Sequence, residues 1–222
     1  MNSQDKISKA RDLKWLTFGL GVGLITIFLT VRISYTWIIW LLAVVIYSVA
    51  TKKPSEIGIT KQGLEKAFLV GLLVGISYGI IRAIILYFVP HSEAVFGAGL
   101  LETINAMEMG EFPIGTITGS AGKIYLIMLF VSTFTVFCWE PFWRGLVLMK
   151  VRRFIPWVVS IGIVAIISAL PHTESTSAFL HSIILGVVGG ELMRRHKNVI
   201  APTMFHLTHF HIALIILWIL RY

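Results

Sequence analysis

One short run holds the residues best suited to chemistry. Within an otherwise apolar stretch the chain reads Trp139-Glu140-Pro141-Phe142-Trp143-Arg144-Gly145. Ionisable side chains are costly in hydrocarbon, so Glu140 and Arg144 are candidate functional groups. They are four residues apart, which places them on one face of a helix, where they can pair. Pro141 removes a backbone donor beside the acid and predicts a kink or local opening there. The alternative is a purely structural role, in which the pair only holds helices together.

Two histidines in later apolar stretches extend this candidate site. His172 follows Pro171, and His206 lies in the last stretch of the chain. A carboxylate and two imidazoles can hold a water, with Glu140 as general base and the histidines orienting the water or stabilising an oxyanion. Glu140, His172 and His206 can equally serve as zinc ligands. Because the three would come from separate helices and no His-Glu-x-x-His run is present, the spacing leaves both chemistries open.

Other hydrolytic chemistries find little support in the residues. The only aspartates, Asp5 and Asp12, lie near the N-terminus, which excludes a pair of membrane-embedded catalytic aspartates. The single cysteine, Cys138, has no acid nearby in sequence that would orient a histidine toward it, and a buried inert thiol is its simpler interpretation. The run from Thr118 to Gly122 does not match a serine-nucleophile motif.

The composition indicates which elements must position these residues. The chain has 222 residues, of which 56% are hydrophobic and 14% charged, unlike an ordinary soluble domain. We therefore predict an all-α fold, a polytopic transmembrane helix bundle of about seven spans, each needing roughly 20 apolar residues. The expected spans are Trp15 to Val31, Thr36 to Ala50, Ala67 to Val89, Ile124 to Met149, Ile155 to Leu170, Ser177 to Met193 and Val199 to Leu220.

The basic residues predict the orientation. With a cytoplasmic N-terminus and seven alternating spans, fourteen of the 19 Lys and Arg residues fall in cytoplasmic segments, as topology rules require. The net charge of +8 is then a topology signal and an attraction to anionic membrane lipid, and nucleic acid is not an expected partner. Arg82, inside the third span, is expected to extend toward Tyr87 and the outer interface. The alternative is that it binds a substrate carboxylate or pairs with an acid.

We expect one membrane domain, residues 1–222, in three parts. Residues 1–14 form a basic cytoplasmic tail, residues 15–123 the N-terminal spans and an acidic outer loop, and residues 124–222 the core with the candidate site. Within the outer loop, Ala94 to Met107 is mildly amphipathic, which is compatible with a short surface helix or with a plain loop.

From Ile124 to the C-terminus the chain resembles the CAAX prenyl endopeptidase and bacteriocin-processing family of intramembrane endopeptidases, also called CPBP or Abi. The family pattern is EExxxR in one span, FxxxH in a later span and HxxxN in a third. Glu140 and Arg144 match the second glutamate and the arginine of the first motif, and His172 and His206 match the two histidines. The lead-in Ile200-Ala201-Pro202 is also similar to the family's.

Three motif positions differ from the family pattern. Trp139 stands at the first glutamate, Ser168 at the phenylalanine and Phe210 at the asparagine. The resemblance implies that the first glutamate activates water and that the asparagine helps to hold the oxyanion. Glu140 would then have to take over the role of base, or catalysis is lost. His209, three residues after His206, is a candidate substitute for the missing polar group.

The resemblance implies an endopeptidase that cleaves a membrane-associated or lipid-linked peptide, such as a bacteriocin or signalling precursor. It also implies a multi-pass protein of the bacterial cytoplasmic membrane. The alternative is a catalytically degenerate relative that acts in bacteriocin immunity or as a binding adaptor. A small transporter would show two similar halves with broken helices, which the sequence lacks. The residues do not indicate an oligomeric state.

Depth presents a difficulty for the site. At about 1.5 Å per helical residue, Glu140 and His206 lie well inside the membrane, whereas His172 falls near the outer end of its span. Straight helices would not bring the three side chains together. A tilted helix, an early helix end at Pro171 or a span that starts after Ile155 is required.

Overall fold

The structure is a computed structural model that describes residues 3–30, 37–89, 104, 121–173 and 175–221. All regular elements within these ranges are helices, which confirms the all-α fold class. They are α1 (Ser3–Thr30), α2 (Trp37–Thr51), the 3₁₀-helix η1 (Pro54–Ile57), α3 (Leu64–Phe88), α6 (Ala121–Glu140), the π-helix η2 (Pro141–Val147), α7 (Leu148–Val151), α8 (Trp157–Ala169), the 3₁₀-helix η3 (Leu170–His172), α9 (Thr176–His196) and α10 (Ile200–Arg221).

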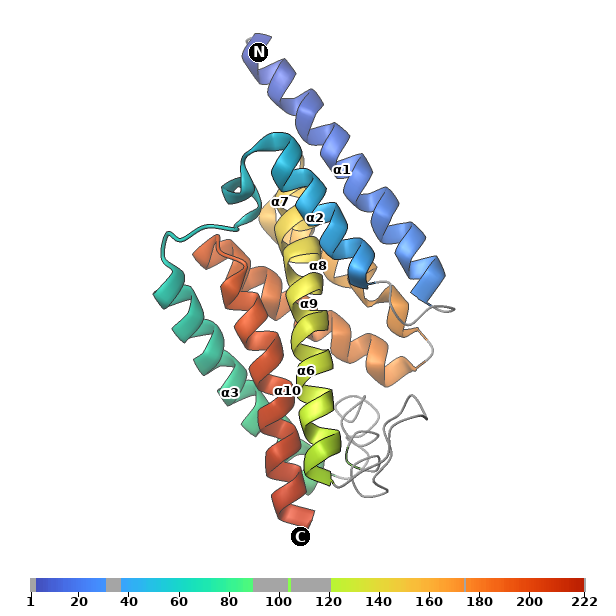
Figure 1. Ribbon diagram of the computed structural model, residues 1–222, viewed down its shortest axis with the longest axis vertical. Helices are drawn as coiled ribbons and strands as arrows, with labels where there is room; N and C mark the ends of the chain where they lie inside the picture. The colour runs from blue at the N-terminus through green and yellow to red at the C-terminus, as the bar shows by residue number, and fades with distance from the viewer. Residues whose placement is uncertain (1–2, 31–36, 90–103, 105–120, 174, 222) are drawn as a thin grey trace.

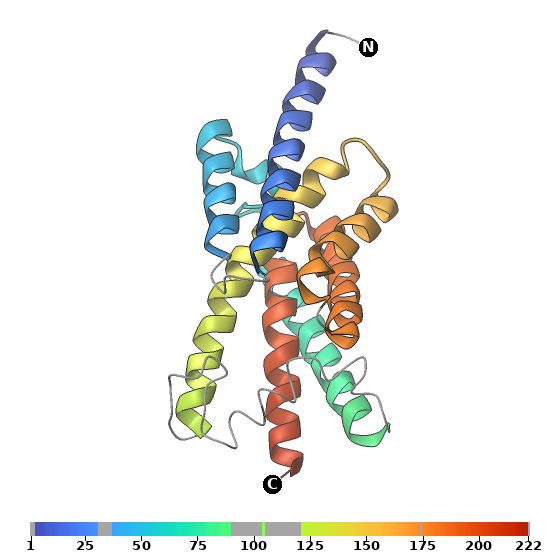
Figure 2. The same ribbon diagram turned by 90° about the vertical axis from the view of Figure 1, so that its right-hand side faces the viewer.

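Four helical segments are long and apolar enough to cross a membrane. They are Leu64–Phe88, Lys123–Val151, Thr176–His196 and Ile200–Leu220, and they identify the chain as an integral membrane protein. Trp37–Thr51 and Trp157–His172 are shorter apolar helices. Each expected span thus coincides with a helix, while the number seven and the orientation stay predictions. The start of α1 and the end of α10 lie at opposite ends of the bundle, as an odd number of spans requires (Figures 1 and 2).

Helix α1 differs from expectation at its beginning. It begins at Ser3, inside the segment expected to be a free basic tail. Its first turns are polar and its later turns apolar, so one helix continues from the aqueous end into the bundle. The acidic loop, including Ala94 to Met107, lies outside the described residues apart from Ile104.

Helices α3 and α10 lie side by side along much of their length (Figure 1). Gly71, Gly75 and Gly79 repeat every four residues on the contacting face of α3. A Cβ atom built at Gly75 would lie 2.8 Å from Thr208 Cβ and 2.9 Å from the Phe205 carbonyl oxygen of α10. Small residues at this spacing let two membrane helices approach closely. This contact fixes α10, and with it His206, against α3.

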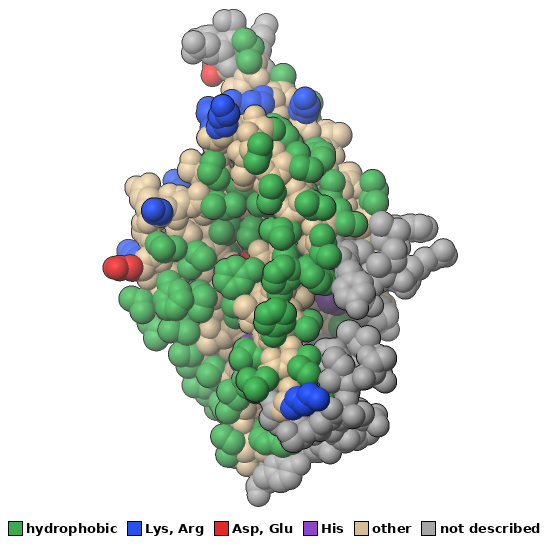
Figure 3. Space-filling model, in the orientation of Figure 1, with side chains coloured by type: hydrophobic (Ala, Val, Ile, Leu, Met, Phe, Trp, Pro, Cys, Tyr) green, Lys and Arg blue, Asp and Glu red, His purple; other side chains and the backbone are tan. Residues whose placement is uncertain are grey.

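The surface follows the same division into apolar and basic parts. In Figure 3, hydrophobic side chains cover the middle of the molecule, and most visible Lys and Arg side chains gather toward the end where α1 begins. Leu73, Phe130 and Val158 are among the exposed apolar side chains, at 60%, 73% and 80% exposure. Such a surface would be an aggregation hazard in water but suits lipid.

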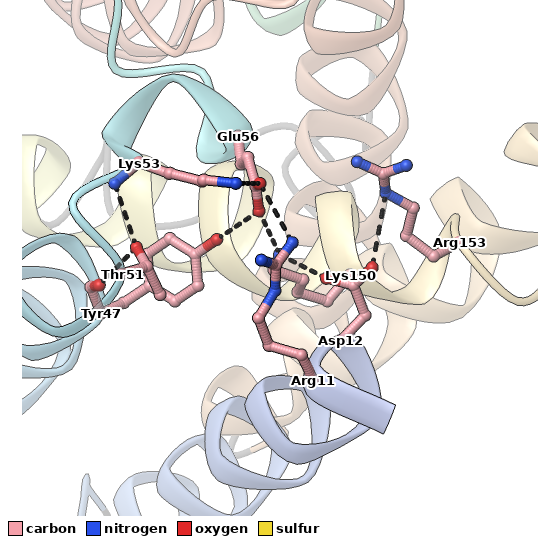
Figure 4. Close-up of polar contacts among 8 residues, drawn as sticks. All are labelled: Arg11, Asp12, Tyr47, Thr51, Lys53, Glu56, Lys150 and Arg153. Carbon is pink, nitrogen blue, oxygen red and sulfur yellow. Dashed lines mark hydrogen bonds and ion pairs between the residues drawn. The ribbon is translucent and has the colours of Figure 1, made fainter. Parts of the chain in front are cut away.

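At the basic end, an ion network joins α1, η1 and α7 (Figure 4). Lys150 Nζ donates to Asp12 Oδ1 at 2.8 Å and to Glu56 Oε2 at 3.1 Å, although Lys150 is only 1% exposed. Tyr47 also donates to Glu56, at 3.0 Å, and Arg11 pairs with it at 3.3 Å. The sequence analysis did not predict these contacts, which join segments far apart in the chain.

The network also sets the ionisation of Glu56, which lies outside the candidate spans. Burial alone would raise the pKa of its carboxyl group. Hydrogen bonds from Lys150 and Tyr47 and the charges of Lys150 and Arg11 outweigh burial, so the pKa is lowered from its usual value of 4.5. Glu56 therefore stabilises the folded state as a carboxylate.

Arg82 is a correction to the sequence analysis. It was expected to extend toward the outer interface, but it is 1% exposed and lies inside the bundle. Its neighbours explain this position, because α3 packs on α10 through the glycine face and Arg82 follows that face by three residues. The tight contact with α10 turns this part of α3 inward.

Candidate active site

The site begins at an interruption in the longest helix. Between α6 and α7 the backbone forms the π-helix η2, which starts at Pro141, directly after Glu140. Figure 2 shows the ribbon changing direction between α6 and α7. Pro141 lacks an N–H and crowds the preceding turn, so the α-helical hydrogen-bond pattern cannot continue unchanged through it. The predicted irregularity at Glu140 is therefore present as a π-helical interruption, and π-helical turns of this kind are frequent at functional sites.

Glu140 is the centre of the site. Its carboxylate is 2% exposed and is shared between two helices. Oε1 lies 2.8 Å from His206 Nδ1 of α10, and Oε2 lies 3.5 Å from Arg144 Nε one helical turn away. With Glu140 ionised, the Nδ1–H of His206 donates to Oε1, and the other ring nitrogen stays available. The expected pairings of Glu140 with Arg144 and with His206 are both present.

One oxygen of Glu140 retains acceptor capacity. Oε2 has no hydrogen-bond donor with good geometry among the described residues, because its approach to Arg144 is an ion pair rather than a directed hydrogen bond. On α9, Gly189 faces this oxygen, and a Cβ there would lie 3.7 Å from it. A buried carboxylate oxygen that faces a glycine can accept a hydrogen bond from a small ligand such as water.

Arg144 is held from the other side by α8 and α9. Its Nη1 donates to Ser168 Oγ at 3.3 Å, and Ser168 in turn donates to the Ala165 carbonyl oxygen at 3.1 Å. Gly186 of α9 packs against Ala165, where a Cβ would be 2.7 Å from that residue's Cβ. Sequence reasoning treated Ser168 only as a departure from the family pattern. The signal that could have found it is a serine within an apolar helix, one turn before His172.

His172 reaches the site through Trp139. Helix α8 begins at Trp157 and ends at Ala169, and Pro171 lies in η3, so two of the three alternatives considered for His172, a late start and an early end, are present. The ring centroids of His172 and Trp139 are 5.9 Å apart. Trp139 is 9% exposed and packs edge-on against Trp40 at 4.6 Å. An indole therefore lies beside His172, at the position where the family has a carboxylate.

A second polar group adjoins His206. The ring of His209 lies 5.5 Å from that of His206, and its Nδ1 donates to the Phe205 carbonyl oxygen at 3.2 Å. His181 of α9 lies 5.7 Å from His209, ring to ring, and 3.5 Å from Tyr78 Oη. The sequence analysis expected His209 as a possible accessory group, but it did not place His181 or Tyr78 near the site, because nothing in the spacing fixes the rotation of α3 and α9 about their axes.

Phe210 lies elsewhere. It packs with the apolar cluster of Ala213, Leu214 and Leu217, and its ring contacts His211 edge-on at 5.4 Å. It supplies no polar atom to Glu140, which agrees with its apolar character in a position where the family has an amide.

The side chains do not fit the zinc alternative. In the part of the chain that the structure describes, no three His, Cys, Asp or Glu side chains are gathered closely enough to hold a metal ion. Glu140 and His206 are in contact at 2.8 Å, and the ring of His172 packs beside that of Trp139 at 5.9 Å. The chemistry proposed below therefore uses the side chains alone.

Comparison with known protein families agrees with the geometry. Residues 121–210 match the family described as type II CAAX prenyl endopeptidase Rce1-like. Curated proteins and solved structures give no match. The matched segment starts with α6 and includes every residue of the Glu140 site named from the motifs. This match supports the family resemblance over residues 121–210, the segment that carries the candidate site.

Proposed function

We propose that the protein is a membrane-embedded endopeptidase that hydrolyses a peptide bond of a membrane-associated or lipid-linked peptide, using water activated by Glu140. The observation that carries this proposal is the buried Glu140 carboxylate, which contacts His206 at 2.8 Å and Arg144 at 3.5 Å beside a π-helical opening. A carboxylate held this way by two cationic or hydrogen-bonding partners stays ionised and oriented.

The proposed chemistry follows from the free capacity of Oε2. A water that donates to Oε2 loses its proton to Glu140 as it attacks the peptide carbonyl carbon. His206 and Arg144 keep the carboxylate in place. The remaining nitrogen of a neutral His206 can accept a hydrogen bond from the attacking water, and that of a protonated His206 can donate one to the oxyanion. The proton held by Glu140 then passes to the leaving amine. A positioned general base of this kind contributes about 10²- to 10⁴-fold in rate.

Arg144 and Ser168 act as positioning residues in this proposal. Arg144 fixes the carboxylate of Glu140 from the side opposite His206, and Ser168 fixes the guanidinium. His172, whose ring lies 5.9 Å from that of Trp139, is proposed to stabilise the oxyanion. We infer a cytoplasmic N-terminus, which the gathering of basic side chains toward that end supports (Figure 3). The bacterial cytoplasmic membrane is proposed from the family resemblance alone.

The test is cleavage of a library of membrane peptides by the purified full chain in detergent or lipid. Glu140→Gln keeps the side-chain volume and the acceptor for His206 but removes the base, so cleavage should fall at least 10²-fold. Glu65→Gln, at the exposed start of α3, is the matched control and should keep full activity. Equal activity of wild type and Glu140→Gln would rule out the proposed base.

A second candidate function is binding without cleavage, in immunity or as an adaptor. The observations that favour it are Trp139 and Phe210, which place an indole and a phenyl ring where the family has a carboxylate and an amide. In this case wild type and Glu140→Gln would both capture the same peptides and neither would cleave them. Cleavage by wild type alone would refute the binding-only function.

A further inference from the structure

A cleft of about 930 Å³ opens between the beginning of α3 and the end of α9. Its walls include Val70 and Val74 of α3 and Val188 and Leu192 of α9, and Lys66 and Lys197 lie at its rim. Neither Glu140, Arg144 nor His206 lines it. The cleft is therefore a separate feature, and its chemistry has to be explained independently of the peptidase site.

The rim carries positive charge that the protein leaves uncompensated. Arg195 also borders the cleft, but both Arg194 and Arg195 bind Glu191, at 2.6 Å each. Among the described residues, no carboxylate lies within ion-pair distance of Lys66 or Lys197, and both lysines are exposed. Two free ammonium groups at one opening form a site for an anion.

The walls are apolar and run into the membrane-spanning part of the molecule. Val70 and Val74 are one turn apart on α3, and Val188 and Leu192 are one turn apart on α9, so each pair forms a stripe along its helix. Both helices are candidate spans. From Lys66 to Val74 the cleft extends along α3 by roughly 12 Å, at 1.5 Å per residue. A soluble anion would leave this apolar length unmatched.

We propose that this cleft binds an anionic phospholipid, with the phosphate headgroup at Lys66 and Lys197 and one acyl chain between the valine stripes of α3 and α9. The charge of the rim and the polarity of the walls match the two parts of such a lipid, and basic pockets between membrane helices are known to hold anionic headgroups. Helix α3 begins at its end nearer to the start of α1 (Figure 1), so the lysines of the rim lie on the side where the headgroup layer of a bilayer would be.

The binding test uses the full chain, delipidated in a neutral detergent and titrated with phosphatidylglycerol or phosphatidylcholine while bound lipid is counted by native mass spectrometry. Phosphatidylglycerol should bind and phosphatidylcholine should not. Lys66→Gln with Lys197→Gln should weaken phosphatidylglycerol binding about 25-fold, since each lysine near an anionic surface contributes roughly fivefold. Unchanged binding would overturn the proposal.

The matched control is Lys9→Gln with Lys14→Gln, which removes the same charge from exposed positions on α1 at the same end of the molecule. It should bind phosphatidylglycerol like the wild type. Equal weakening of the two double variants would show general attraction to charge and overturn a site in the cleft. Thermal unfolding without added lipid, followed by circular dichroism, verifies that each variant is folded.

Two further measurements separate the lipid from other occupants. Val74→Trp fills the apolar part of the cleft and leaves both lysines intact, so lipid binding should be lost; binding that survives would overturn the acyl-chain part of the proposal. Glycerol phosphate in millimolar excess should not displace the lipid, and displacement would assign the rim to a soluble phosphate. A dimer that disappears in Lys66→Gln with Lys197→Gln would assign the cleft to a second copy of the chain.

Discussion

Glu140→Gln offers the sharpest test of the charge state on which the proposed site depends. The substitution keeps the shape of the side chain and an oxygen that His206 can still donate to, so the main change is the loss of negative charge beside Arg144. Arg144 is 2% exposed and lies 3.5 Å from the carboxylate. If Glu140 is ionised in the folded protein, Gln leaves a buried guanidinium without a counter-ion.

The magnitude follows from the distance and the burial. At 3.5 Å and an effective dielectric constant of about 20, opposite unit charges attract by about 5 kcal/mol. Removing one member of a buried pair costs about 3 to 5 kcal/mol, because the other charge is left buried. We expect Glu140→Gln to lower the free energy of unfolding by about 3 kcal/mol or more. Arg144→Met leaves the buried carboxylate without a counter-ion instead and should lower the free energy of unfolding by a similar amount.

The double variant Glu140→Gln with Arg144→Met completes a thermodynamic cycle. Removing both charges removes the unpaired one as well, and replacing a buried ion pair by uncharged groups is often nearly neutral. The double variant should therefore be more stable than either single variant. The assay is reversible unfolding in mixed micelles of mild detergent and dodecyl sulfate, followed by helical circular dichroism. Glu65→Gln, an exposed position, is the control and should change stability by less than about 0.5 kcal/mol.

Two results would contradict this account. A cost below about 1 kcal/mol for Glu140→Gln would mean that Glu140 is neutral in the folded state and cannot serve as a base. Additive single costs in the double variant would mean that the two charges do not act on one another. Either result would refute the electrostatic basis of the proposed site, whatever the peptidase assay shows.

Three further predictions test other contacts. His206→Gln should lower any peptide cleavage about 10²-fold or more, while His196→Gln, at the end of α9, should change it less than twofold; initial rates with a cleaved library peptide measure both. Gly75→Ala should destabilise the protein by about 1 to 3 kcal/mol in micelle unfolding because its Cβ meets α10, whereas Gly162→Ala, with nothing within 4 Å, should not destabilise it. Folding lowers the pKa of Glu56, so the carboxylate's contribution to stability is complete above the unfolded pKa of 4.5 and is lost as the pH falls through the lower folded pKa. Below pH 4.5 the melting temperature of Glu56→Gln should therefore fall less steeply than that of wild type.

Much of the fold could be predicted because each membrane helix can be recognised from its own segment of the sequence. A run of apolar residues of sufficient length is a signal that needs no knowledge of the neighbours. The ion pair of Glu140 and Arg144 was likewise predictable, since residues four apart on one helix lie close together on the same face. The π-helix at Pro141 follows from the chemistry of proline itself. These features depend on one segment each.

Contacts between helices could be predicted only in part. The contact of Glu140 with His206 depends on the rotation of α10, which the spacing does not specify, and it was anticipated through the order of family motifs. His181 and Tyr78 beside His209 were not anticipated for the same reason. The buried pair of Lys150 and Asp12, at 2.8 Å, could not be predicted because topology rules assign basic residues to a side of the membrane but give them no partner.

The glycines of α9 show what additional signal the sequence held. Gly186 and Gly189 are three residues apart in an apolar helix, which indicates a face that another element approaches closely. The Glu140–Arg144 pair approaches this face. A Cβ atom built at Gly186 would lie 3.3 Å from Arg144 Nη2, and one built at Gly189 would lie 3.7 Å from Glu140 Oε2. A buried ion pair needs space for its charged ends as well as partners for them, and a side chain at either glycine would occupy that space. Glycines on one face of an apolar helix, considered together with charged residues in another span, would therefore have predicted that α9 contacts the site.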